Sequence, residues 1–149
     1  MSTNTLSSTA NGLGYAGLIP FVTFTLALVA WPEKQLWWHS ALLAYGAVIL
    51  SFVGAIHWGL AMQARDSRER PAALAWSVVP SLLGWVALLV SAPWGYPVLL
   101  FGLWLHYAQD LRWPADSPLP EWYLPLRTRL TGVASICLLL AWVTETVLR

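Results

Sequence analysis

Charged residues are scarce in this sequence. Only 10% of its 149 residues are Asp, Glu, Lys or Arg, against about 25% in soluble domains. Hydrophobic residues make up 58%, and so few charges cannot cover the surface of a soluble globule. The net charge of +1, without a basic face or stripe, also argues against a nucleic-acid partner.

Cysteine is nearly absent as well. The single Cys137 excludes an intrachain disulfide framework and cannot by itself form a structural zinc site. Residues 1–12 lack the positive charges of a secretory signal and the arginines of a mitochondrial transit peptide. We therefore expect the first apolar run to be retained and the protein to reside in a bacterial inner membrane.

Long apolar runs are what the sequence has instead. A helix rises about 1.5 Å per residue and the hydrocarbon core is about 30 Å thick, so about 20 apolar residues make one crossing. The runs predict one membrane domain over residues 1–149, an all-α bundle of five transmembrane helices. The expected spans are residues 13–31, 37–62, 72–92, 94–113 and 126–148.

Lysine and arginine are unevenly distributed among the connections. Five crossings place six of them on one side, namely Arg65, Arg68, Arg70, Arg112, Arg127 and Arg129, and leave Lys34 and Arg149 on the other. Cytoplasmic loops carry the excess of such residues. The distribution predicts a cytoplasmic N-terminus and a cytoplasmic loop at residues 63–71.

Small residues recur every fourth position in the second span, at Ala47, Ser51, Ala55 and Gly59. Such a stripe lets another helix backbone approach closely, so we expect it to be a packing seam. In the first span, Pro20 frees a backbone carbonyl in mid-membrane. This predicts a kink whose carbonyl is satisfied by neighbouring groups or water.

Two histidines lie well inside predicted spans, where ionisable side chains are candidates for function because their burial is expensive. His57 and His106 are each six residues from the inner end of a span, and therefore lie at one depth. Asp110 follows His106 by one turn on the same face, where it could orient the imidazole or take its proton. With Arg127 or Arg129, which enter the fifth span at that surface, these residues predict a polar cluster near the inner leaflet.

Each of these side chains also has a purely structural interpretation. A histidine near a helix end can snorkel or bond a backbone carbonyl, and arginines there are ordinary positive-inside anchors. His57 lies opposite the small-residue stripe of its helix. That placement favours a central helix with protein on both sides, and hence a buried His57.

Most of the 11 tryptophans fall at predicted membrane surfaces, where aromatic belts are expected. Trp58, Trp85 and Trp104 lie within spans instead. Trp85 and Trp104 are deep enough for the indole N–H to need a partner or a ligand. We assign these three side chains to the wall of a ligand site.

Three functions could use the polar cluster. The first is a cavity for a small hydrophobic or amphipathic molecule, polar at its inner mouth and walled by aromatic rings. This function requires the fewest side chains in an exact arrangement. Alternatively, the two histidines could clamp a b-type haem, with Gly46, Gly54 and Gly102 making room for the macrocycle. Without haem we expect no cofactor and no metal. A metal-dependent enzyme would need more ligands and the H-E-x-x-H signature is absent, so we assign no catalytic residue and expect a non-enzymatic protein.

Four segments of the chain resemble a domain-of-unknown-function family of small membrane proteins, found in bacteria and, as a transmembrane protein, in animal mitochondria. They are GLIPF (17–21), YGAVILSFVGAIHWG (45–59), WSVVPSLLGW (76–85) and WYLPLRTRLT (122–131). The resemblance implies a multi-span inner-membrane protein and lends no activity. A weaker likeness to the tryptophan-rich sensory or translocator proteins, which bind porphyrins and sterols, is an analogy, because the W-x-P-x-W motifs of that group do not align.

We therefore expect a protein that binds a small hydrophobic ligand in its inner half. The alternative is an accessory subunit of a larger membrane complex, or a homo-oligomer, because the small-residue stripe and the small extramembrane mass also suit a protein partner.

Overall fold

The structure is a computed structural model that describes residues 3–63, 70–90, 92–112 and 119–147. Secondary structure in these residues is entirely helical, which confirms the prediction of an all-α membrane bundle. The helices are α1 (Thr3–Ala16), α2 (Ile19–Ala30), the 3-10 helix η1 (Pro32–Lys34), α3 (Gln35–Gln63), α4 (Arg70–Leu89), α5 (Gly95–Asp110) and α6 (Tyr123–Val147). The charged loop predicted at residues 63–71 falls mostly outside the described residues.

The first predicted span consists of two helices. α1 ends at Ala16 and α2 begins at Ile19, with Pro20 in the first turn of α2, where proline needs no helical N–H partner. The Tyr45 hydroxyl of α3 donates a hydrogen bond of 2.8 Å to the carbonyl of Gly17 in the break. The expected kink is thus a full interruption, and a neighbouring helix satisfies an exposed carbonyl there.

Four segments are long and apolar enough to cross a membrane: Thr5–Ala30, Pro32–Met62, Pro71–Leu89 and Tyr123–Val147. α5 is shorter, at 16 residues. We expected this helix to continue to Trp113, but it ends at Asp110, and Leu111 and Arg112 form a turn. The backbone N–H of Arg112 donates to the carbonyl of Gln109, three residues earlier, so the chain leaves the α-helical pattern there, and Trp113 lies outside the described residues.

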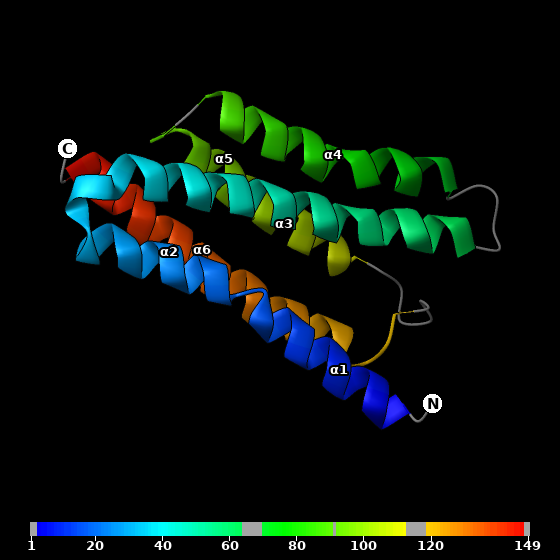
Figure 1. Cartoon of the computed structure of the whole chain (residues 1–149). Helices are drawn as coiled ribbons and strands as arrows, with labels where there is room; N and C mark the ends of the chain where they lie inside the picture. Colours follow the sequence, from blue (N-terminus) through cyan, green and yellow to red (C-terminus); the bar gives the residue numbers. More distant parts are fainter. Residues whose placement is uncertain (1–2, 64–69, 91, 113–118, 148–149) are drawn as a thin grey trace.

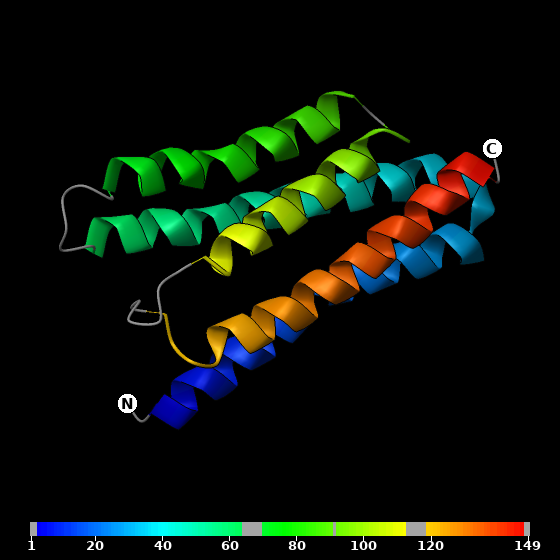
Figure 2. The same cartoon turned by 180° about the vertical axis from the view of Figure 1, so that it is seen from behind.

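α3 lies in the middle of the bundle (Figure 1). It contacts α2, α4 and α5, while α6 packs against α5, α2 and α1. The view from behind shows α5 crossing in front of α3, between α4 and α6, and α5 contacts both of these helices (Figure 2). In both views the start of α1, the ends of α3 and α5 and the starts of α4 and α6 lie at one end of the molecule. That shared end holds the candidate site.

The core contains many leucines from α3, α5 and α6, packed with other apolar side chains such as Phe21 of α2. Leu42, Leu50, Leu99, Leu103 and Leu138 are each no more than 2% exposed. Many large apolar side chains, such as Leu26, Val29 and Leu82, instead lie on the outer surface. That distribution suits a bundle whose outer surface faces lipid.

The seam between α3 and α4 runs along a different line from the predicted stripe. A Cβ on Gly84 would lie 3.0 Å from the carbonyl oxygen of Ala47, and one on Gly54 would lie 2.9 Å from that of Ser77. Ala55 is exposed, and nothing lies within 4 Å of a Cβ on Gly59. The stripe prediction was therefore right at Ala47 and wrong at Ala55 and Gly59.

Candidate functional site: a buried polar cluster beside an apolar cavity

Asp110, at the end of α5, is the centre of the polar cluster. Its carboxylate is fully buried and accepts hydrogen bonds from two other helices. His57 of α3 lies with Nε2 2.8 Å from Oδ1, and Arg127 of α6 donates from Nε to Oδ2 over 3.0 Å. The Tyr123 hydroxyl donates a longer bond of 3.4 Å to Oδ2. One carboxylate therefore ties α3, α5 and α6 together.

His106 lies one turn before Asp110, with its ring 4.7 Å from that of His57, centroid to centroid. Its Nε2 lies 3.1 Å from the carbonyl oxygen of Val53, and Trp76 donates from its indole nitrogen to Nδ1 over 3.3 Å. A carbonyl only accepts and an indole N–H only donates. His106 is therefore the neutral Nε2–H tautomer, and both of its nitrogens are engaged.

The cluster contains one matched pair of charges. Arg127 is 5% exposed and Asp110 is 0% exposed, so both ions are taken out of solvent together. Removing one partner of such a pair is strongly destabilising, because it leaves the other charge buried alone. The pair therefore fixes the start of α6 against the end of α5.

His57, His106 and Asp110 each offer one ligand atom, and these atoms lie within 4.8 Å of one another. Three ligands of this kind could approach a divalent cation. Here, however, both His106 nitrogens already have partners, and the Arg127 guanidinium lies directly on the carboxylate. A cation would have to break these bonds beside a positive charge, so the arrangement favours a closed hydrogen-bond network.

The arrangement also does not favour the haem alternative. The His57 and His106 rings are in contact with each other, which leaves no room for an iron between them. Both nitrogens of His106 also already have partners. The glycines expected to make room are filled by packing. A Cβ on Gly46 would lie 2.8 Å from Leu99, and one on Gly102 would lie 2.6 Å from Leu50. These glycines allow helices to approach each other.

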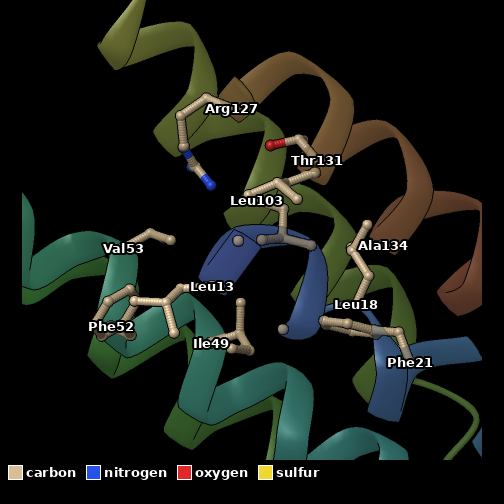
Figure 3. Close-up of a pocket in the computed structure, with 13 residues that line it drawn as sticks. Leu13, Leu18, Phe21, Ile49, Phe52, Val53, Leu103, Arg127, Thr131 and Ala134 are labelled. Carbon is tan, nitrogen blue, oxygen red and sulfur yellow. The ribbon is translucent and has the colours of Figure 1, made fainter. Parts of the chain in front are cut away.

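A cavity of about 150 Å³ adjoins the cluster at the break between α1 and α2. We call it the α1–α2 cavity. Its lining is Leu13, Gly14, Gly17, Leu18, Phe21, Ile49, Phe52, Val53, Leu103, Arg127, Leu130, Thr131 and Ala134. Arg127 is the only charged residue among them (Figure 3). The break between the two helices and the two glycines beside it leave this space open.

Two polar groups of residues that line the cavity have no hydrogen-bond partner among the described residues. They are Nη2 of Arg127 and Oγ1 of Thr131, on side chains that are 5% and 2% exposed. Figure 3 shows the Arg127 guanidinium and the Thr131 hydroxyl at the same end of the cavity. Buried donors are rarely left unpaired in native proteins. This end of the cavity therefore presents hydrogen-bonding groups to whatever fills it.

The structure brings four of the predicted site residues together, namely His57, His106, Asp110 and Arg127. It does not bring the predicted tryptophans to them. Trp58, Trp85 and Trp104 are 48%, 59% and 52% exposed, on the outer surface of α3, α4 and α5. Trp58 directly follows the inward-facing His57, and Trp104 lies two residues before His106, so helical geometry turns both away from the site.

Sequence reasoning missed Trp76, Tyr123 and Thr131. For α6 a signal was present, because Tyr123, Arg127 and Thr131 are spaced four residues apart and therefore share a face. Trp76 gave no such signal, since only the packing of α4 places its indole against His106, stacked at 6.5 Å between ring centroids.

A second polar cluster at the opposite end of the bundle was also missed. His39 of α3 lies with Nδ1 2.6 Å from the Tyr96 hydroxyl and Nε2 3.0 Å from a carboxylate oxygen of Glu145. We call these three residues the outer cluster. They come from α3, α5 and α6, as the residues around Asp110 do. In the sequence His39 directly follows Trp37 and Trp38 at the predicted start of a span, a position that gives no signal of a buried site.

The amino-acid sequence of the chain matches a known protein family and several known proteins. The family described as "Protein of unknown function (DUF3429)" matches residues 6–143. The chain is similar to transmembrane protein 69 of Xenopus tropicalis, with 37% identity over 135 residues that cover 82% of this chain and 49% of that protein. It is also similar to transmembrane protein 69 of Mus musculus, with 30% identity over 135 residues that cover 89% of this chain and 54% of that protein. The chain thus spans about half the length of the curated relatives it matches, and no solved structure matches it.

Proposed function

Because the chain belongs to the DUF3429 family of proteins of unknown function, whose name assigns no activity, we propose a function from the site itself. The protein is a multi-pass membrane protein that binds a small hydrophobic or amphipathic molecule in the α1–α2 cavity, next to the polar cluster. No residue is assigned a catalytic role.

The observation that carries this proposal is the composition of the cavity. Its wall is apolar apart from the Arg127 and Thr131 side chains at one end, which is the usual character of a small-molecule site. Leu13 and Phe52, which border it, are 70% and 66% exposed, so it adjoins the lipid-facing surface. An apolar cavity of about 150 Å³ accommodates a molecule such as benzene. A ring or branched segment therefore fits inside, with any longer tail in the bilayer.

We also propose that the polar cluster lies near the cytoplasmic face of a bacterial inner membrane, with the N-terminus in the cytoplasm. The distribution of Lys and Arg supports this orientation. Six of the eight Lys and Arg residues belong to the predicted side that carries Arg112 and Arg127, and cytoplasmic loops carry the excess of such residues. A ligand would then enter from the inner leaflet.

A cavity-filling substitution tests the binding proposal. Ile49→Trp places a large ring in the cavity wall, whereas Ile136→Trp makes the same change on the exposed side of α6. Wild-type protein, purified in mild detergent and solvent-extracted, should release a small apolar molecule detectable by mass spectrometry. Ile136→Trp should retain that molecule, and Ile49→Trp should lose it.

The same purified protein also tests the alternative function, that of an accessory subunit. Equal amounts of the molecule in both variants, or an extract containing bulk lipid only, would contradict binding in the cavity. A protein that co-purifies in stoichiometric amount with an empty cavity would favour the accessory-subunit function.

A further inference from the structure

The polar end of the α1–α2 cavity restricts the chemistry of its ligand. Arg127 Nη2 can only donate, and the Thr131 hydroxyl can donate or accept. Both lie on side chains at least nine-tenths buried and have no partner in the described part of the chain. An oxygen atom with two lone pairs could accept from both. The cavity is thus shaped for an acceptor oxygen at one end of an apolar body.

The charge of the site distinguishes between acceptors. The guanidinium already forms an ion pair with Asp110, Nε to Oδ2, at 3.0 Å. Because His106 is the neutral tautomer, it adds no positive charge. A carboxylate ligand would place a second anion close to the buried Asp110 and would have to shed its own hydration. A carbonyl group accepts the same hydrogen bonds without that desolvation cost.

From this geometry, and resting on the function proposed above, we propose that the ligand is a neutral carbonyl compound. Its carbonyl oxygen accepts hydrogen bonds from Arg127 Nη2 and Thr131 Oγ1, and its apolar body lies against Phe21, Ile49 and Leu103. Membrane-soluble ketones and quinones belong to this class.

Three single-ring probes of similar shape separate the alternatives: 4-fluoroacetophenone, 4-fluoroethylbenzene and 4-fluorobenzoate. Binding is measured by fluorine NMR on nanodisc-embedded protein, with empty nanodiscs as the reference for partition into lipid. The ketone should bind about tenfold more tightly than the hydrocarbon, since two hydrogen bonds are each expected to contribute about threefold to fivefold. The carboxylate should bind more weakly than the ketone.

Thr131→Val is the decisive variant, because it removes the hydroxyl while keeping the side-chain shape. It also removes an unpartnered polar atom, so the protein should remain folded. Affinity for the ketone should fall about fivefold, and affinity for the hydrocarbon should stay the same. Ser135→Ala is the matched control, since Ser135 is also buried and unpartnered among the described residues but does not line the cavity. It should leave all three affinities unchanged.

Each other result overturns a stated part of the proposal. If the carboxylate binds most tightly, the ligand is anionic. If ketone and hydrocarbon bind equally, or Thr131→Val has no effect, the carbonyl contact is wrong while the cavity stands. If none of the probes binds above the empty nanodiscs, the proposed function fails together with this inference.

Discussion

At the scale of single residues, Asp110 has the most consequential position in the bundle. It is the shared acceptor of His57, Arg127 and Tyr123, and it is fully buried. A single carboxylate can bind three donors because its two oxygens offer about four lone pairs. The side chains around it are thereby held in place beside the cavity.

We predict that Asp110→Asn is much more damaging than Tyr123→Phe. The amide keeps the size of the carboxylate but leaves Arg127 as a buried charge without an anion, which should lower the free energy of unfolding by about 3–5 kcal/mol. Loss of the long Tyr123 bond should cost under about 1 kcal/mol. Thermal unfolding in one detergent measures both. The double variant Asp110→Leu with Arg127→Leu should unfold at a higher temperature than Asp110→Asn alone, and a lower temperature would contradict the ion-pair interpretation.

At the scale of helices, the spacing of the small residues along α3 determines which of them pack against α4. A step of four residues advances about 400° around a helix and drifts about 40° from the contact line, whereas a seven-residue step drifts only about 20°. Ala47 and Gly54 are seven apart and both lie in the seam with α4. Ala55 and Gly59 continue the four-residue series and leave it.

A pair of adjacent substitutions tests this seam. Gly54→Leu would force side-chain atoms against the Ser77 carbonyl and the Pro80 ring, and should destabilise the protein by about 1–3 kcal/mol or more. Ala55→Leu adds the same bulk one residue along, on an exposed face, and should change stability by under about 0.5 kcal/mol. Melting temperatures in detergent compare the two. Equal losses would show that α3 and α4 pack along another line.

At the scale of the whole molecule, the sequence predicted the membrane class, most of the helices and the meeting of His57, His106 and Asp110. These predictions succeeded because the length of an apolar run, and the depth of a residue within its span, can be read from the local sequence. The roles of Trp76 and Thr131, and the position of the cavity, could not be predicted in the same way. They depend on which faces of α4, α6 and the α1–α2 break come together, and that is set by packing between distant segments.

The orientation of the molecule remains a prediction from the Lys and Arg distribution. Ser67→Cys, in the predicted cytoplasmic loop, should react with a membrane-impermeant maleimide only after inner membranes are opened. Glu33→Cys, exposed in η1 at the other end, should react in intact spheroplasts. The native Cys137 is buried and gives little background. The reverse pattern would invert the proposed topology, and labelling of both sites from one side would contradict the crossing of α3, which lies between them.

The outer cluster has an electrical consequence. His39 and His57 lie five turns apart on α3, about 27 Å along the axis. Between their levels the described core is mainly apolar and includes Leu50, Leu99, Leu103 and Leu138, none more than 2% exposed, beside the buried hydroxyl groups of Thr25 and Ser135. This layer is mostly apolar and holds few hydrogen-bonding groups that could relay a proton. The membrane voltage therefore drops mainly across this apolar layer between the two clusters. Moving one elementary charge through 100 mV costs about 2.3 kcal/mol. Each cluster stays close to the potential of its own aqueous side.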